Sequence, residues 1–458
     1  MLQTQVILKS AKSLLIKESF QTQIMKNLKN IFTFFILVLL TSCSKDNEAL
    51  APAVNPVAIS SMGPTTGAKN TAVVLMGTGF SNNAASNIVT LNGKVCTVNQ
   101  ASATQLNITI PAKSSTGNII VTVAGNSAQS TPFTYINTVT VSTLAGSTAG
   151  FQDGTGAAAE FDTPSGITID EVGNIYVTDF FNRRIRKITA MGLVTTFAGS
   201  GALGSLDGTG TSAQINGPTG IVFDKTTNNL FVTQKFEHKI RKITAAAVVT
   251  TLAGSTQGFA DGTGLSARFS NPRGITMDSS GNLFIADQSN HKIRKVTPTG
   301  VVTTVAGNVL GFADGTSTNA LFENPGFIIS DAIGNLYVTD SSNHKIRKIT
   351  PAGVVSTIAG STAGFANGVG LNAQFSFPQG VVIDANGNLL ICDTNNHKIR
   401  KISQTGIVTT IAGDTAGSAD GIGTIARFNN PHGLCIDNDG TLYVTDERNH
   451  KIRKIVID

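Results

Sequence analysis

The chain has 458 residues, with 34 Lys and Arg against 28 Asp and Glu, which gives a formal net charge of +6. Five of the lysines and one glutamate precede Cys43, so the chain from Cys43 onward carries a charge of only about +2. The chain has four Tyr and no Trp. A concentrated basic face with stacking aromatic residues is therefore missing, and we expect no nucleic acid partner.

Residues 1–42 are predicted to be a signal region. A basic start at Met25–Asn30 is followed by an apolar run at Ile31–Leu40. This ten-residue run, which is apolar except for Thr33, is too short to span a bilayer permanently, which indicates a secretion signal rather than a membrane helix. Residues 1–24 would make this signal unusually long, so we expect translation to start at Met25.

The segment that follows the apolar run indicates lipid attachment. Leu40-Thr-Ser-Cys43 resembles the lipid-acceptor site of bacterial lipoproteins, which implies lipidation of Cys43. Ser44–Glu48 is similar to the signal that some Bacteroidota use to export lipoproteins to the outer face. These resemblances imply an outer-membrane, cell-surface protein held by a lipid anchor, with residues 43–55 as its tether.

Residues 56–136 are predicted to form a separate all-β unit, because short alternating apolar runs are punctuated by Gly, Asn and Pro. The motifs Gly63-Pro-Thr-Thr-Gly67, Gly77-Thr-Gly-Phe80 and Phe133-Thr-Tyr135 resemble the IPT/TIG domain. That resemblance implies an immunoglobulin-like sandwich. Its residues suggest no catalytic set, so we interpret it as a stalk.

Residues 137–458 consist of repeats. A closing glycine recurs every 53 residues, with one spacing of 55, and each unit holds four short β-rich runs. Such a period with four strands per unit predicts a propeller blade, and six copies predict a six-bladed β-propeller. The motif Asn-His-Lys-Ile-Arg-Lys, or a near variant, begins at Asn182, Glu237, Asn290, Asn343, Asn396 and Asn449.

The ends of the array predict how the ring closes. The last unit stops at Asp458 after three strands, and Thr138–Gly146 has the sequence of the missing fourth strand. This segment is expected to pair as the outermost strand of the sixth blade, which leaves no open edge. The expected fold class is therefore all-β, with a sandwich followed by a propeller that an N-terminal outer strand closes.

The units resemble NHL repeats through their Pro-x-Gly, Gly-Asn-Leu-Tyr-Val-x-Asp and Asn-His-x-Ile signatures. Propellers of this family include protein-binding, RNA-binding and enzymatic members. The resemblance therefore implies the fold, whereas the function must come from a site placed on it.

The positions that differ between the copies indicate where such a site could lie. The middle residue of Pro-x-Gly stands at the entrance of each innermost strand and should surround the mouth of the central channel. Its polar mixture suits a polar ligand, although exposed positions can also simply drift. The candidate ligand-binding residues are Ser165, Thr219, Arg273, Gln379 and His432.

The residues that repeat in every copy are interpreted as scaffold. The turn histidines should stabilise their own hairpins, and the loop phenylalanines should form small cores. The loop carboxylates could bind calcium, but a turn-forming role is favoured because each loop has one acid, and no cofactor is expected. A Cys392–Cys435 bridge is conceivable, with buried thiols as the alternative. The loop position that could bind calcium is occupied, in the six repeats, by Asp153, Asp207, Asp261, Asp314, Asn367 and Asp420.

The predicted function is binding, by a monomer, of a glycan or of a surface or secreted protein. The alternative is a propeller enzyme, namely a lyase, lactonase or hydrolase with its site at the channel mouth. That mouth is expected to hold one histidine, one arginine and no acid, a poor set for metal-assisted or acid–base chemistry. We therefore predict no enzyme activity and name no catalytic residue.

Overall fold

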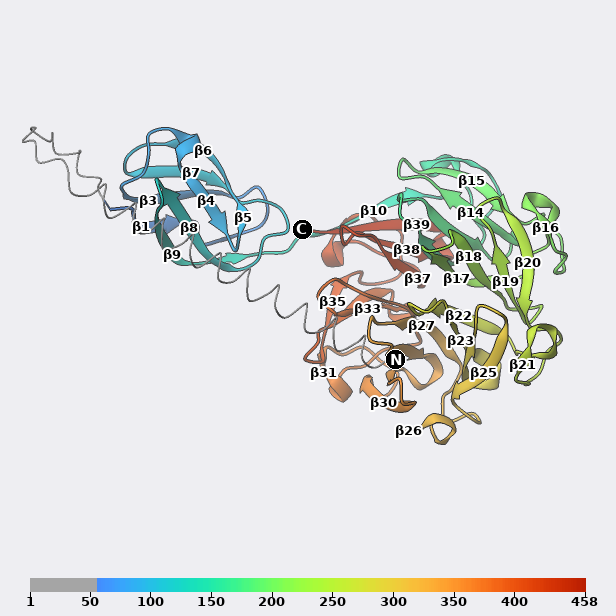
Figure 1. The fold of residues 1–458 in the computed structure, drawn as a ribbon. Helices are drawn as coiled ribbons and strands as arrows, with labels where there is room; N and C mark the ends of the chain where they lie inside the picture. Colours follow the sequence, from blue (N-terminus) through green and yellow to red (C-terminus); the bar gives the residue numbers. More distant parts are fainter. Residues whose placement is uncertain (1–55) are drawn as a thin grey trace, which may run out of the picture. The chain divides into compact units, whose positions relative to one another are not determined.

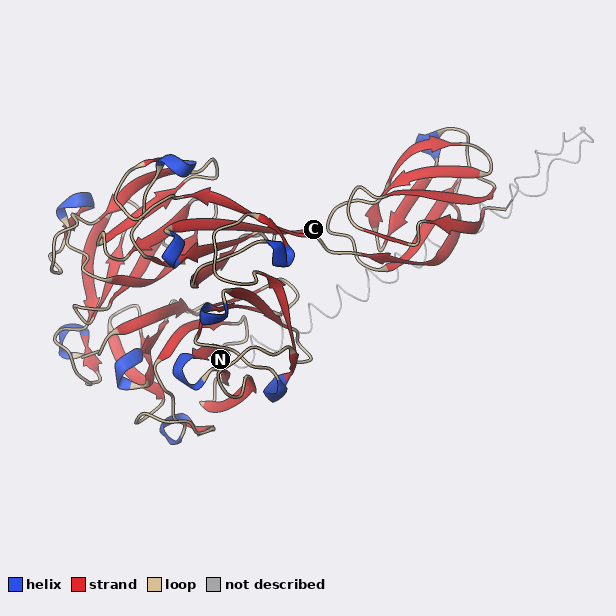
Figure 2. Ribbon diagram, turned by 180° about the vertical axis from the view of Figure 1, so that it is seen from behind, coloured by secondary structure: helices blue, strands red, loops and turns tan. Residues whose placement is uncertain are grey.

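The computed structural model describes residues 56–458, which are all-β apart from short 3-10 turns (Figures 1 and 2). The predicted signal region, the lipidation site Cys43 and the tether up to residue 55 lie outside the described residues. Across residues 56–458, no helix has the length and apolar character that crossing a membrane requires.

Residues 58–135 form two packed sheets, as predicted for this segment. Alternate residues of β3, such as Val73 and Leu75, are buried against residues of the other sheet, such as Val121 and Phe133. The first sheet has the order β1 (Ala58–Gly63), β3 (Ala72–Thr78), β7 (Gln105–Thr109) and β6 (Thr97–Ala101). The second has the order β2 (Thr66–Gly67), β9 (Asn126–Tyr135), β8 (Gly117–Val123), β4 (Ile88–Leu91) and β5 (Lys94–Val95), and η2 (Ala84–Ser86) precedes β4.

Residues 139–457 form six five-stranded sheets, which we number one to six in chain order (Figure 1). The innermost strands are β12 (Pro164–Ile169), β17 (Pro218–Asp224), β22 (Pro272–Met277), β27 (Pro325–Ser330), β32 (Pro378–Ile383) and β37 (Pro431–Ile436). The second strands are β13 (Ile175–Asp179), β18 (Asn229–Gln234), β23 (Leu283–Asp287), β28 (Leu336–Asp340), β33 (Leu389–Asp393) and β38 (Leu442–Asp446).

The outer strands follow in the same order. The third strands are β14 (Arg184–Ile188), β19 (Lys239–Ile243), β24 (Lys292–Val296), β29 (Lys345–Ile349), β34 (Lys398–Ile402) and β39 (Lys451–Ile457). The fourth strands are β15 (Leu193–Ala198), β20 (Val248–Ala253), β25 (Val301–Ala306), β30 (Val354–Ala359), β35 (Ile407–Ala412) and, for sheet six, β10 (Val139–Ala145). In sheets three to six, a 3-10 turn follows the second strand: η6 (Gln288–Asn290), η8 (Ser341–Asn343), η10 (Thr394–Asn396) and η12 (Glu447–Asn449).

Each sheet has a fifth strand where the repeat predicts four. Two residues of the long loop pair with the fourth strand, as Gly154 does with Val194 in sheet one. This short strand covers the outer edge of the sheet, which would otherwise present unpaired backbone groups. These strands are β11 (Gly154–Thr155), β16 (Gly208–Thr209), β21 (Gly262–Thr263), β26 (Gly315–Thr316), β31 (Gly368–Val369) and β36 (Gly421–Ile422); the 3-10 turns η3 (Gly156–Ala158), η4 (Gly210–Ser212), η5 (Gly264–Ser266), η7 (Ser317–Asn319), η9 (Gly370–Asn372) and η11 (Gly423–Ile425) follow them.

The N-terminal strand closes the ring as the sequence predicts. β10 runs antiparallel to β39, with Val139 opposite Ile457 and Val141 opposite Ile455. The innermost strands of neighbouring sheets contact one another in sequence, and β12 also contacts β37. The first and last sheets are thereby joined, which confirms the propeller closure.

A buried arginine fixes the long loop of each sheet. The guanidinium of Arg294 is fully buried and donates to Asp287 at 2.7 Å and to the loop residue Asp261 at 2.6 Å. It also donates to the carbonyls of Ala260 and Arg268, at 2.8 and 3.1 Å. The loop carboxylates thus have protein cations as partners, and within residues 56–458 no group of three or more His, Cys, Asp or Glu is arranged to hold a metal ion.

The repeated histidines hold the next sheet rather than their own hairpin, which corrects the prediction for them. His291 adopts a left-handed conformation with φ 56°, and its Nδ1 accepts the backbone N–H of Asn324 in the following sheet at 3.3 Å. His344 accepts likewise from Phe377 at 3.1 Å. These histidines are therefore scaffold residues, as expected, although the element they stabilise is the junction between sheets.

The loop phenylalanines divide into two groups. The second of each loop, such as Phe269, is fully buried, which confirms the predicted loop core. The first, such as Phe259, is half-exposed and lies beneath the cations of Lys292 and Arg294. Cys392 and Cys435 are buried free thiols, so the conceivable bridge between them is absent from the described structure.

Candidate functional site

The ends of two strands in every sheet meet at the channel axis. The innermost strand begins at the proline of Pro-x-Gly, and the second strand, which is antiparallel to it, ends directly opposite; Pro164 pairs with Asp179 in sheet one. The x residue of the first strand and the residue after the second therefore converge on one face of the ring. Chain direction alone thus brings two variable positions per sheet to this face.

Four of the five predicted residues surround one cavity of about 140 Å³ on this face. They are Ser165, Thr219, Arg273 and His432, which come from sheets one, two, three and six. Gln379 does not line it: its side chain is fully buried, and its Nε2 and Oε1 have no hydrogen-bond partner among the described residues. The cavity is also lined by Thr163, Phe180, Phe181, Lys235 and Glu447.

The floor of the cavity is a contact across the ring. Arg273 of sheet three donates through its guanidinium to Nε2 of His432, which belongs to sheet six. The other imidazole nitrogen, Nδ1, lies 3.3 Å from Ser165 Oγ and 3.4 Å from the Ser165 carbonyl. Since arginine can only donate, Nε2 is the acceptor and Nδ1 carries the proton. His432 is therefore a neutral imidazole with both nitrogens engaged.

This floor is more enclosed than the open channel mouth that the sequence suggests. His432 is 2% exposed and Ser165 is 4% exposed, whereas Arg273 is partly exposed. Phe327 packs edge-on against the imidazole, with the ring centroids 5.2 Å apart. Further along the same innermost strands is an apolar cavity of about 310 Å³, whose lining includes Ile167, Ile221, Ile275, Ile328, Val381 and Leu434.

Two charged residues that the sequence reasoning missed complete the cavity, Lys235 of sheet two and Glu447 of sheet six. The signal for them was present, because the residue after the second-strand Asp or Gln differs in every copy. That position lies inside an otherwise repeated turn, which masks its variation. The residues that follow the second strand in sheets one to six are Phe180, Lys235, Gln288, Ser341, Thr394 and Glu447.

An aromatic cluster forms one side of the cavity. Phe180 packs against Phe181 with centroids 4.9 Å apart, and against Phe236 of sheet two at 5.3 Å. Phe181 is 52% exposed. Sheets three to six have Ser289, Ser342, Asn395 and Arg448 at the position of Phe181 and Phe236. The aromatic side is therefore specific to sheets one and two and is no part of the repeat.

Burial shifts the pKa of each ionisable group of the cavity. It lowers the pKa of Arg273 to about 10, against the opposing effect of Glu447. It also lowers the pKa of Lys235, with Arg273 adding to the decrease, and it raises the pKa of Glu447. Burial and the neighbouring guanidinium hold the pKa of His432 well below its usual range. Shifts of this kind, gathered in one cleft, are typical of a functional site.

These charges form no close ion pairs, unlike the charges of the scaffold. Every loop aspartate is in an ion pair with a buried arginine, as in Arg347 with Asp314 at 2.8 Å. By contrast, neither Lys235, Arg273 nor Glu447 forms an ion pair with any residue in the described part of the chain. The cavity therefore presents two cations and one carboxylate that are available to a ligand.

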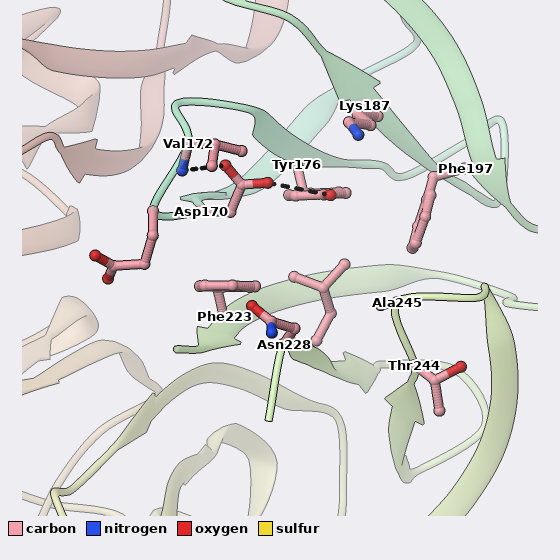
Figure 3. Close-up of a pocket in the computed structure, with 11 residues that line it drawn as sticks. Asp170, Val172, Tyr176, Lys187, Phe197, Phe223, Asn228, Thr244 and Ala245 are labelled. Atoms are coloured by element: carbon pink, nitrogen blue, oxygen red, sulfur yellow. Dashed lines mark hydrogen bonds between the residues drawn. The ribbon is translucent and has the colours of Figure 1, made fainter. Parts of the chain in front are cut away.

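A second cavity, of about 260 Å³, lies between sheets one and two and is a weaker candidate (Figure 3). One of its two carboxylates, Asp170, accepts from the Val172 backbone N–H at 3.1 Å and from the Tyr176 hydroxyl at 3.4 Å, as the dashed lines in Figure 3 show. Tyr337 and Asp331 repeat the contact in sheet four, at 3.3 Å. The Asp170–Tyr176 contact thus belongs to a recurring turn.

The comparisons with known proteins agree with this fold. Residues 269–296, 375–402 and 428–455 match the NHL repeat, residues 56–135 match the IPT/TIG domain, and residues 156–178 match a beta-propeller repeat. The class is thus an IPT/TIG domain followed by a propeller with NHL repeats.

Individual relatives cover parts of this arrangement. The Arabidopsis thaliana protein SUPPRESSOR OF QUENCHING 1, chloroplastic, is 32% identical over 55% of this chain and 26% of its own length. The human NHL repeat-containing protein 2 is 29% identical over 63% of this chain and 46% of its own length. The chain thus spans less than half the length of either relative.

Solved structures extend the likeness over both domains. A Bacteroides thetaiotaomicron protein of unknown function has a TM-score of 0.62 and 23% identity, over 89% of this chain and 99% of that one. An auxiliary nutrient binding protein from Bacteroides ovatus has a TM-score of 0.57 and 19% identity, over 88% and 98%. At these identities the likeness establishes the fold.

Proposed function

We propose that this protein is a binding protein whose axial cavity, defined by Arg273, Lys235, Glu447, His432 and the Phe180–Phe181 pair, takes a small polar ligand. The observation that carries the proposal is the convergence of unpaired charges at positions where the repeats differ. Charged groups without partners are costly to hold in a partly buried site, and a ligand that pairs with them offsets that cost.

The size of the cavity favours a small molecule or the end of a glycan over a protein surface. About 140 Å³ is comparable to the ~150 Å³ of a cavity that holds one benzene ring, whereas a stable protein interface needs a broad complementary face. The aromatic side supplies a stacking surface built from Phe, in a chain with four Tyr and no Trp. The Bacteroides ovatus protein of similar fold is described as binding nutrients, which is consistent with this role.

The N-terminal sequence supports a cell-surface setting for this binding role. We propose that Cys43 is lipidated, that the chain is anchored in the outer membrane with its domains exposed at the cell surface, and that residues 43–55 act as a tether. A lipid anchor followed by an immunoglobulin-like domain would present the cavity to material outside the cell.

Enzymatic activity receives less support. The cavity does contain an acid, Glu447, which the sequence reasoning did not place there. However, both nitrogens of His432 are engaged by Arg273 and Ser165, so the imidazole has no free acceptor with which to act as a general base. The site is better equipped to bind a charged group than to transfer a proton.

A thermal-shift screen of the purified protein tests the proposed function. The panel would contain neutral, anionic and zwitterionic small molecules, together with plant and microbial polysaccharides. We expect at least one compound to raise the melting temperature of the wild type and of Lys225→Ala, but not of Lys235→Ala. Both variants lose one positive charge, and Lys225 is an exposed residue of a turn outside the cavity. Stabilisation that survives Lys235→Ala and Arg273→Ala alike, or binding only to protein partners, would overturn the proposal.

A further inference from the structure

The charge balance of the axial cavity narrows the ligand class. With His432 neutral, Arg273 and Lys235 contribute two positive charges and Glu447 one negative charge, which leaves one positive charge uncompensated. A ligand with one net negative charge would balance the site, whereas a neutral or zwitterionic ligand would leave the excess in place. Arginine, with its planar set of donors, is suited to a carboxylate.

Glu447 adds a second requirement. Its carboxylate can only accept hydrogen bonds when ionised, and no described Lys, Arg or His lies within ion-pair distance of it. A ligand that fills the cavity must therefore bring its own donors, and hydroxyl groups provide them without adding positive charge. A purely aromatic acid would lack these donors and would leave Glu447 unsatisfied.

The aromatic side of the cavity determines the shape of the ligand that fits it. Phe180 and Phe181 lie at the cavity with partly exposed rings, and such rings stack against the flat C–H face of a six-membered ring. The volume of about 140 Å³ matches a cavity that holds one unsubstituted ring, so some substituents of a hydroxylated ring extend towards solvent beside the exposed Phe181. Shape and polarity thus point to a single hydroxylated ring.

We propose, building on the binding role argued above, that the cavity recognises a hydroxylated six-membered ring with one carboxylate, that is, a uronic acid. The carboxylate contacts Arg273 and Lys235, hydroxyls donate to Glu447, and one ring face rests on one ring of the T-shaped Phe180–Phe181 pair. The uronic acid is either free or the terminal unit of an acidic polysaccharide. No bond is made or broken in this recognition.

Isothermal titration calorimetry with the purified protein tests this inference. The probes are D-glucuronate, D-galacturonate, D-glucose, glucose 6-phosphate, L-phenylalanine and trigalacturonate. We expect one or both uronates to bind and glucose to bind at least about tenfold more weakly, because it lacks the charged contact. If trigalacturonate binds more tightly than galacturonate, the ligand is the end of a polysaccharide chain. If trigalacturonate binds equally or more weakly, the ligand is the free acid.

Single-residue variants test which side chains contact the carboxylate and the hydroxyls of the uronate. Lys235→Met and Arg273→Met should each weaken uronate binding by at least about tenfold, with Lys225→Ala unchanged. Glu447→Gln should reduce the preference for the hydroxylated acid over a simple acid such as benzoate.

Three results would overturn the inference. Glucose could bind as well as a uronate, glucose 6-phosphate or L-phenylalanine could bind more tightly than a uronate, or no uronate could bind at all. If the broader thermal-shift screen still yields a Lys235-dependent compound, the binding role stands and only the ligand class fails. If that screen also yields none, the binding role itself fails.

Discussion

At the scale of single residues, the propeller places a buried arginine in all six sheets, but the partner of that arginine is not the same in every sheet. In five sheets the buried arginine of the third strand bonds the aspartate that ends the second strand, as Arg294 does with Asp287. In sheet two, Arg241 bonds Gln234, which is neutral. The chain thus contains its own comparison between a buried ion pair and a charged–neutral pair.

We expect Arg294→Met to lower the free energy of unfolding by roughly 3–5 kcal/mol, because it leaves the carboxylate of Asp287 buried without its cation. Arg241→Met should cost clearly less, since the residue left behind is an uncharged amide. Both variants lose equivalent bonds to loop carbonyls, so the difference isolates the buried charge. Urea denaturation measures both values, and equal losses would show that the carboxylate adds nothing.

The buried His432 predicts an acid-dependent loss of stability. Its folded-state pKa lies well below the value near 6.5 of an unfolded chain, so the unfolded state binds more protons below that pH. The contribution of the neutral imidazole is therefore present above about pH 6.5 and is lost progressively as the pH falls below it. The stability difference between wild type and His432→Gln should shrink between pH 8 and pH 5, as measured by urea denaturation. A difference that stays constant over this range would disprove the assignment.

At the scale of elements, the closure by β10 follows from the repeat itself. The sixth unit lacks a fourth strand, and the segment before the first unit has its sequence. The fifth strands could not be predicted in this way, because the two-residue pairing of Gly154–Thr155 depends on how the long loop folds back. Local sequence predicts a strand only when an alternating run is long enough to show it.

Removing β10 should leave β39 as an exposed edge. We expect deletion of Thr138–Gly146 to give a protein that aggregates or melts at a clearly lower temperature. Placing the same segment after Asp458 through a short turn should restore the melting temperature, because Val139 already lies opposite Ile457. Differential scanning calorimetry compares the three proteins. A deletion variant that melts like the wild type would show that the closure is dispensable.

At the scale of the whole molecule, the sequence repeats predict the fold but make some variable residues of the site difficult to recognise. The divergence at Pro-x-Gly was visible, and four of those residues do surround one cavity. Lys235 and Glu447 were not proposed, because their turn looked like part of the motif. The contact between Arg273 and His432 crosses from sheet three to sheet six, and nothing in either local sequence encodes which side chain spans the axis.

The proposed anchor makes a prediction for the complete chain. When the full-length protein is expressed in a bacterium that processes lipoproteins, the wild type should incorporate labelled palmitate and sediment with membranes. Cys43→Ser should abolish both, because it removes the thiol that accepts the lipid. Wild-type protein without label would contradict the lipidation, and protection from external protease in intact cells would contradict the surface orientation.

The variable residues at the channel axis are proposed to form a ligand site, and a crystal structure of the protein soaked with D-glucuronate or D-galacturonate would test this proposal. We expect density for one sugar ring beside Phe180 and Phe181, with its carboxylate within hydrogen-bonding distance of Arg273 and Lys235. Density only in another cavity, such as the one beside Tyr176, or an empty axial cavity at saturating ligand, would contradict it.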